Sequence, residues 1–132
     1  MAIFLETSAF LRLLFREEGA KDVQARLAKA GTVVASRLLR VEAERAVLRA
    51  SLDFRALAKS LHVIQHGMRS AIAAITFLEI TREVCDLAGR IAPQSGLRAL
   101  DAIHLATYWT LKTVQPDLEI LTFDERILRE LA

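Results

Sequence analysis

Short apolar runs alternate with longer helical patterns along this chain. The runs are AIFL (2–5), TVVAS (32–36), TFLEI (76–80) and EILTF (119–123), and their length and β-branched or aromatic content favour buried strands. Between them, helical segments are predicted at 7–16, about 22–29, from about 37 through the 60s, from 81 to before 93, at 97–112, and from 124 to the end. This alternation predicts an α/β fold with a mainly parallel sheet covered by helices on both faces.

Polar and small residues mark where these helices begin and end. A hydroxyl or carboxylate can accept a hydrogen bond from the first free backbone N–H groups of a helix, and such residues precede the predicted helices at Thr7 or Ser8, Ser36, Thr81 and Asp124. Gly31 is the expected C-cap of the second helix. The pair Gly67-Met68 is the expected interruption of the long helical stretch.

Acidic residues follow two of the predicted strands. In parallel sheets, ligands bind beyond the carboxyl ends of the strands, where Glu6 follows the first strand and Asp124 the last. Asp101 lies in the first turn of its helix, where the helix dipole favours an anion. Periodicity does not choose between Glu42 and Glu44. Taken alone, each acid except Glu6 is explained equally well by a helix cap, the helix dipole or a solvated charge, so the pattern indicates an acidic edge without specifying its chemistry.

Length and composition describe the setting of this edge. At 132 residues, 53% hydrophobic and 26% charged, residues 1–132 are predicted to form a single globular domain. No apolar run reaches the ~20 residues of a membrane span, and no signal peptide is expected. The single cysteine, Cys85, excludes an internal disulfide and is expected as a small core residue of a cytoplasmic protein. Arginine supplies 14 of the 18 basic residues, which suits phosphate contacts but equally suits exposed helix faces.

Four blocks of the sequence together resemble a known family. FLETSAFLRLLFREEG, SRLLRVEAERA, LRALDAIHLATY and LTFDERI are similar, in order, to the blocks of PIN-domain proteins, especially the VapC-like toxins of bacterial toxin–antitoxin pairs. The resemblance spans nearly the whole chain. It implies a three-layer α/β/α fold with a mainly parallel four- to five-stranded sheet.

The resemblance also implies a function and a set of site residues. It implies an endoribonuclease, dependent on Mg²⁺ or Mn²⁺, that hydrolyses phosphodiester bonds of structured RNA with metal-activated water. Carried over by position, the catalytic and metal-binding acids are Glu6, Glu42, Asp101 and Asp124, and the match of V-E after S-R-L-L-R selects Glu42 over Glu44. Carboxylates are the oxygen ligands that such hard cations prefer.

One position departs from the family pattern. The family usually has aspartate where this chain has Glu6, whose side chain is one methylene longer. A catalytically weak domain that only binds RNA or a protein partner is therefore the alternative function. A phospho-acceptor receiver domain also uses acids at strand ends. Such a domain is expected to have a lysine near the end of its last strand, and the segment LTFDE contains no lysine, so this alternative is disfavoured.

Several other residues are candidates for supporting roles. Hydroxyls or a guanidinium that could orient water, cap helices or contact phosphate are found at Thr7, Ser8, Ser36, Thr122 and Arg98. His104 shares a helix face with Asp101, and a packed, hydrogen-bonded role is favoured for it over a catalytic one. Tyr108 and Trp109 are expected in the core or an interface.

The resemblance implies partners as well. These are an RNA substrate, a cognate antitoxin that blocks the pocket, and a second copy of the chain, with no membrane. A homodimer is consistent with the apolar excess expected on helices at Phe10, Leu13, Leu14, Phe15, Leu52 and Phe54.

Overall fold

Four parallel strands form the centre of the molecule. The structure is a computed structural model that describes residues 1–53 and 58–132. The strands are β1 (Ala2–Leu5), β2 (Thr32–Ser36), β3 (Thr76–Leu78) and β4 (Glu119–Leu121). They lie in the order β3-β2-β1-β4, and every pair is parallel. This confirms the predicted parallel sheet, although β3 and β4 end two residues earlier than their apolar runs do.

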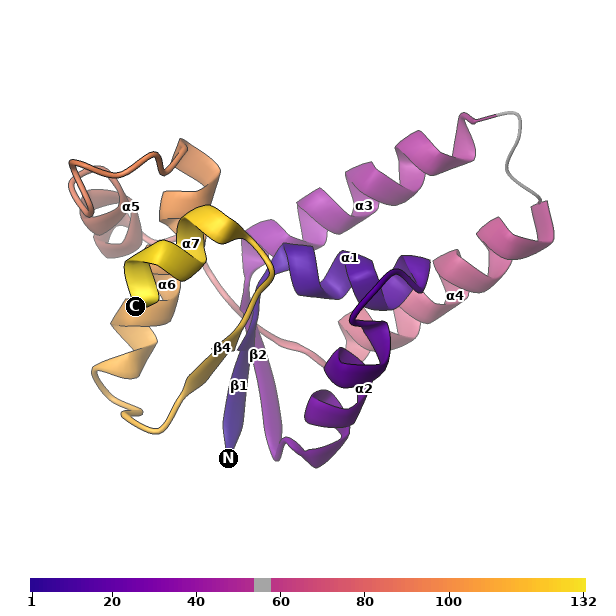
Figure 1. Cartoon of the computed structure of the whole chain (residues 1–132), viewed down its shortest axis with the longest axis horizontal. Coiled ribbons are helices and arrows are strands. Elements are labelled where there is room, and N and C mark those ends of the chain that lie inside the picture. The colour runs from indigo at the N-terminus through magenta and orange to yellow at the C-terminus, as the bar shows by residue number, and fades with distance from the viewer. Residues whose placement is uncertain (54–57) are drawn as a thin grey trace.

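Helices lie on both sides of this sheet. They are α1 (Thr7–Phe15), α2 (Ala20–Lys29), α3 (Arg37–Ser51), α4 (Ala58–Ala74), α5 (Arg82–Ala88), α6 (Ala99–Lys112) and α7 (Glu125–Leu131). In Figure 1, α1 to α4 lie to one side of the strands and α5 to α7 to the other. The expected three-layer α/β/α architecture is confirmed.

Alternating strand residues create two separate cores. Ile3 and Leu5 point to one face, where they pack in a cluster with residues of α1, α2 and α3 such as Phe10. Phe4 points to the other face and packs with residues of α6 such as Leu105. Because successive side chains of a strand face opposite ways, a strand buried on both faces must be apolar throughout, as β1 is.

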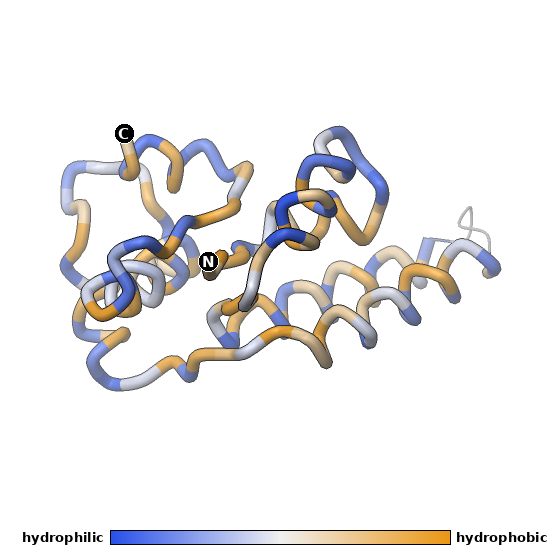
Figure 2. The backbone as a smooth tube through the Cα atoms, turned by 90° about the horizontal axis from the view of Figure 1, so that it is seen from below, coloured by the Kyte–Doolittle hydropathy of each residue, from blue (hydrophilic) through white to orange (hydrophobic). Residues whose placement is uncertain are grey.

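A helical hairpin extends from the body of the molecule. In Figures 1 and 2, α3 and α4 run side by side away from the sheet, and hydrophobic positions recur along both helices in Figure 2. The chain turns after Ser51, at the end of α3, and Gly67 lies inside continuous α4. The expected interruption at Gly67-Met68 is therefore wrong, because a helix tolerates one glycine at a cost of about 1 kcal/mol.

The helix ends confirm some expected caps and correct others. Ser36, Thr81 and Asp124 cap α3, α5 and α7 through their side chains, as expected. The cap of α1 is Glu6 rather than Thr7 or Ser8. The expected C-cap at Gly31 is also wrong, because Ala30 ends α2 in extended conformation while the Gly31 N–H donates to the carbonyl of Met1 at 2.8 Å.

Burial corrects two further expectations. Cys85 is exposed rather than part of the core. Of the apolar residues expected at a dimer interface, Phe10 and Leu14 are buried in the chain's own core, whereas Leu52 is 75% exposed. Phe54 lies outside the described residues. Tyr108 is buried as expected. Within the described part of the chain, none of the helices has the length and apolar character needed to cross a membrane.

Candidate active site

The carboxyl ends of the strands and the starts of several helices meet at one edge of the sheet. Figure 1 shows α1, α3, α6 and α7 all beginning at this edge. Glu6 directly follows β1, Thr122 directly follows β4, and Asp124 precedes α7. Asp101 lies in the first turn of α6. Glu6 and Asp124 therefore lie at the carboxyl edge of the sheet, where the sequence pattern predicted them.

Glu6 is buried and has three hydrogen bonds to one carboxylate oxygen. Only 5% of the residue is exposed. Its Oε1 accepts from the Ser8 N–H at 3.1 Å, from Ser8 Oγ at 2.5 Å and from Thr122 Oγ1 at 2.5 Å. Glu6 thus caps α1 and joins the end of β1 to the end of β4. A charge buried at this position has the hydrogen bonds that its burial requires.

The chain after β4 is held by the same hydroxyls. Ser8 Oγ accepts from the Phe123 N–H at 2.8 Å, and Thr122 Oγ1 accepts from the Asp124 N–H at 3.0 Å. Asp124 Oδ1 then accepts from the Ile127 N–H at 3.0 Å. Thr122 therefore links Glu6 to Asp124, although they are far apart in sequence.

Glu42 forms the second part of the site, with Thr7 and His104. Its Oε1 accepts from Thr7 Oγ1 at 2.6 Å and lies 2.5 Å from His104 Nε2. Burial alone would raise the pKa of the Glu42 carboxyl, but the hydrogen bonds from His104 and Thr7 outweigh it. Electrostatic attraction by His104 and Arg98 adds to them, and the net pKa is lowered. Glu42 is therefore a carboxylate at neutral pH, and Thr7 connects it to the strand end that carries Glu6.

Asp101 is the acid at the start of α6. Its Oδ2 accepts from the Arg98 N–H at 3.2 Å and lies 3.5 Å from Arg98 Nε. The side chain of Asp101 is 10% exposed and that of Arg98 is 69% exposed. Arg98 thus carries positive charge from this edge into solvent. His104, one turn further along α6, brings the helix to Glu42.

Four of the five supporting candidates form hydrogen bonds with the acids, and the fifth caps a helix instead. Thr7, Ser8, Thr122 and Arg98 all bond to one of the four acids. The Ser36 hydroxyl instead accepts from the Leu38 N–H at 3.1 Å and caps α3. Glu44 is exposed and pairs with Arg40 at 2.7 Å, so the structure brings Glu42 rather than Glu44 to this edge.

The donor set suits a hard divalent cation in its chemistry. Hydrogen bonds among the described residues use only Oε1 of Glu6 and Glu42, Oδ2 of Asp101 and Oδ1 of Asp124, so the second oxygen of each acid remains as a ligand. In residues 1–53 and 58–132, no three His, Cys, Asp or Glu side chains are grouped to hold one ion. Mg²⁺ commonly takes only one or two carboxylates and completes its shell with water and phosphate, so the residues fit such an ion.

Sequence reasoning missed one ionic pair at the same sheet edge. Glu79 follows β3, as Glu6 follows β1, and pairs with Arg37 at 2.5 Å. The hydrogen bond between them raises the pKa of Arg37 and lowers that of Glu79, and the Arg37 guanidinium also lies 5.0 Å from the Phe77 ring centre. Glu79 lies inside the strand predicted over 76–80, and its place at a strand end is visible only in the structure, where β3 ends at Leu78.

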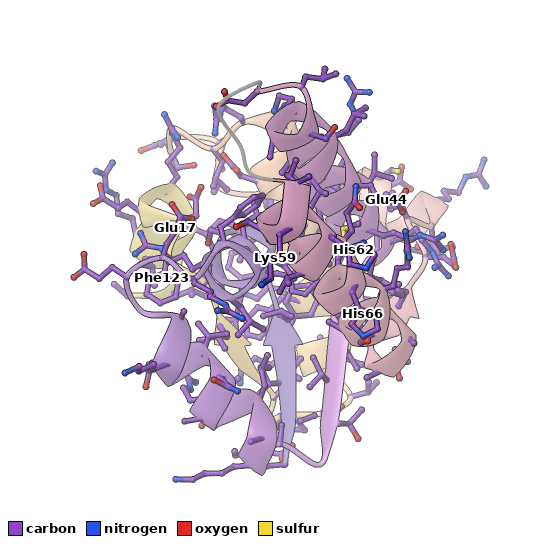
Figure 3. All side chains as sticks on the ribbon, turned by 90° about the vertical axis from the view of Figure 1, so that its right-hand side faces the viewer. Glu17, Glu44, Lys59, His62, His66 and Phe123 are labelled. Carbon is purple, nitrogen blue, oxygen red and sulfur yellow. The ribbon has the colours of Figure 1, made fainter. Side chains whose placement is uncertain are left out.

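The largest described cavity lies elsewhere. This cavity has a volume of about 760 Å³ and lies between the α1–α2 turn and α4. Its lining residues include Leu14, Gly19 and Ile64. Figure 3 views this side, with Glu17 at the turn and Lys59 on α4. None of the four acids lines this cavity, so size alone does not identify the site.

Comparisons with known proteins identify the family of this chain. The PIN domain family model matches residues 3–132. Ribonuclease VapC46 of Mycobacterium tuberculosis is 36% identical over 127 residues, which cover 96% of this chain and 87% of that protein. The fold is similar to that of the Mycobacterium tuberculosis sarcin-ricin loop cleaving toxin VapC20, with a TM-score of 0.68 at 14% identity over 97% of this chain and 94% of that one.

A toxin–antitoxin complex from Klebsiella pneumoniae contains a chain of similar fold, with a TM-score of 0.64 at 22% identity over 97% of this chain and 90% of that one. The family model and the match to VapC46 each cover nearly the whole chain. This chain therefore belongs to the PIN-domain family, as a relative of the VapC proteins.

Proposed function

We propose that this chain is a ribonuclease toxin of a toxin–antitoxin system, which hydrolyses phosphodiester bonds of structured RNA with the help of Mg²⁺ or Mn²⁺. The observation that carries the proposal is the hydrogen-bonded network at one sheet edge, in which Thr122 links Glu6 to Asp124 and Thr7, the neighbour of Glu6, bonds to Glu42. Among residues 1–53 and 58–132, each acid keeps one oxygen outside the hydrogen bonds that hold it. The similarity to a VapC ribonuclease supports the same conclusion.

The residues of this edge have separate roles in the proposal. Glu6, Glu42, Asp101 and Asp124 would form the cation site, with one or two of them as direct ligands and the others acting through bound water. When bound, such a cation supplies charge neutralisation at the phosphate and lowers the pKa of the attacking water. Thr7, Ser8 and Thr122 hold the acids in place, and the exposed guanidinium of Arg98 is placed to meet an RNA phosphate.

The partners follow from the same comparison. RNA is the substrate class, and an antitoxin that covers the acidic edge is the protein partner. Support for the antitoxin is the similar fold of a chain in a toxin–antitoxin complex.

An RNA cleavage assay with matched glutamate variants tests the proposed function. Glu42→Gln and Glu44→Gln change positions two residues apart on one helix, but only Glu42 contacts His104 and Thr7. We expect the wild type and Glu44→Gln to cleave a pool of folded RNAs with added Mn²⁺, and Glu42→Gln to cleave at least tenfold more slowly. Equal rates for both variants, or cleavage that EDTA leaves unchanged, would contradict the proposal.

A further inference from the structure

The contact between His104 and Glu42 has a feature that neither the acids nor the family explains. His104 is 1% exposed, and among the described residues its Nδ1 is buried without a hydrogen-bond partner. Its other ring nitrogen, Nε2, lies 2.5 Å from Glu42 Oε1. Buried polar atoms are nearly always paired, so the unpaired Nδ1 is unusual. The contact of Nε2 with Glu42 is therefore the interaction that accounts for a buried histidine at this position.

The identity of the proton donor follows from the partners. An ionised carboxylate can only accept hydrogen bonds, so Nε2 must carry the hydrogen of this contact. Nε2 is therefore the hydrogen-bond donor to Glu42.

The geometry around Glu42 shows what this donor does. Oε1 receives two hydrogen bonds, one from His104 Nε2 and one from Thr7 Oγ1, and these donors are 3.2 Å apart. One comes from α6 and the other from the start of α1, so the two clamp the carboxylate from different elements. A glutamate side chain on a helix otherwise rotates freely, and this clamp fixes it and leaves Oε2 as the oxygen for a ligand.

We propose that His104 is a positioning residue that, with Thr7, orients Glu42 for divalent cation binding through its Nε2–H donor. This inference rests on the proposed function and deepens it by assigning a role to a residue outside the acid set. Hydrogen-bond partners of metal ligands typically change metal affinity by ~10- to 100-fold when they are lost.

The first test measures the protonation of the His104 ring nitrogens in the metal-free protein. Two-bond ¹⁵N–¹H correlation spectra distinguish a protonated ring nitrogen from a bare one. We expect His104 to show a protonated Nε2, with exposed His62 and His66 as internal references. A spectrum in which Nδ1 carries the proton and Nε2 is bare would overturn the proposal. This readout needs neither metal nor RNA.

The second test measures Mn²⁺ affinity by calorimetry in a set of variants. The amide nitrogen of glutamine falls near the position of Nε2, whereas leucine fills the space without a donor. We expect His104→Leu to weaken Mn²⁺ binding at least ~10-fold, His104→Gln to restore most of that loss, and Thr7→Val to weaken binding in the same direction. Thr107→Val changes a buried hydroxyl of α6 that bonds only within its own helix, and it should bind as the wild type does.

The outcomes separate this inference from the proposed function. Equal Mn²⁺ affinity in the wild type and His104→Leu would reject the clamp even if RNA cleavage depends on the acids. If His104→Leu does not fold, the Mn²⁺ affinity of Thr7→Val and the NMR test for a proton on Nε2 still test the proposal. A clear loss in His104→Leu that glutamine restores supports the clamp even if no RNA is cleaved, and in that case only the proposed function fails.

Discussion

At the scale of single residues, Glu6 combines a structural role, through Oε1, with its proposed role in cation binding, through Oε2. Its Oε1 caps α1 and bonds to Thr122, whereas Oε2 has no hydrogen bond among the described residues. The longer glutamate spans the distance to Thr122 from the strand end. The residue that departs from the family's usual aspartate is thus firmly built into this fold.

Substitutions at Glu6 should separate these two roles. Glu6→Ala removes the cap and leaves the Ser8 and Thr122 hydroxyls without their acceptor, so the free energy of unfolding should fall by about 1–3 kcal/mol. Glu6→Gln keeps an acceptor oxygen and should lose less stability, but its Mn²⁺ affinity should fall because the charge is gone. Urea unfolding and calorimetry measure the two effects. An unchanged Mn²⁺ affinity in Glu6→Gln would remove Glu6 from the ligand set.

Glu42 should make stability depend on acid pH. Its lowered pKa means that its hydrogen bonds stabilise the fold when the carboxyl is ionised, so this contribution is present above the ordinary glutamate pKa and is lost as pH falls through the lower folded value. The difference in unfolding free energy between wild type and Glu42→Gln should be constant from pH 7 to about pH 5 and shrink toward about pH 3. Glu44→Gln, on the exposed face, should show no such trend. A Glu42→Gln difference that grows below pH 5 would contradict the assigned direction.

At the scale of elements, the α1–α2 turn depends on a glycine. Gly19 has a φ of +91°, and a Cβ there would lie 2.9 Å from Phe123 Cζ. Arg12 lies on the same ring, with its guanidinium carbon 4.3 Å from the centroid. The turn thus packs against the segment between β4 and Asp124, and it supports the acidic edge from outside.

Two glycine substitutions should change stability in opposite directions. Gly19→Ala forces a left-handed conformation and a close contact, so we expect a loss of about 1–2 kcal/mol or more. Gly67→Ala lies inside α4, where a Cβ meets nothing within 4 Å, and should gain about 0.5–1 kcal/mol. Thermal and urea unfolding measure both. Equal effects of the two substitutions would contradict this account of the turn.

Element types could be predicted from the sequence, but several ends could not. Short apolar runs and capping residues identified every described strand and most helix starts. Gly67 suggested a break because glycine disfavours helix, yet packing of α4 against α3 and α1 outweighs that preference. Gly31 suggested a left-handed cap, but pairing of β2 with β1 draws its N–H to Met1 instead. Local signals fail where tertiary contacts decide.

At the scale of the whole molecule, the parallel sheet explains how distant residues form one site. The sheet-edge rule placed Glu6 and Asp124, and the family resemblance placed Glu42 and Asp101. The sequence could not predict that His104 and Thr7 would hold Glu42, because the histidine and the glutamate are 62 residues apart and meet only after α3 and α6 pack. The parallel direction of the strands could be predicted, whereas their order and the hydrogen bonds between side chains at the sheet edge could not.

A row of exposed apolar residues on α3 is the surface that suits self-association. Val41, Leu48 and Leu52 are 54%, 46% and 75% exposed, and their spacing puts them on one side of the helix. We predict a homodimer that uses this row, so Leu48→Lys should shift sedimentation toward the monomer, while Leu128→Lys, at an exposed position of α7, should not. A wild type that sediments as a monomer at high micromolar concentration would contradict this prediction.

The central claim is that a divalent cation binds at the sheet edge that carries Glu6, Glu42, Asp101 and Asp124, and an Mn²⁺ titration of thermal stability tests it most directly. A ligand that binds only the native state adds about 2.7 kcal/mol at 100 times its dissociation constant. We predict that the melting temperatures of the wild type and Glu44→Gln rise equally with Mn²⁺. Asp101→Asn keeps an oxygen for the Arg98 N–H but loses the charge, so its rise should be clearly smaller. Equal rises in all three proteins would contradict the claim.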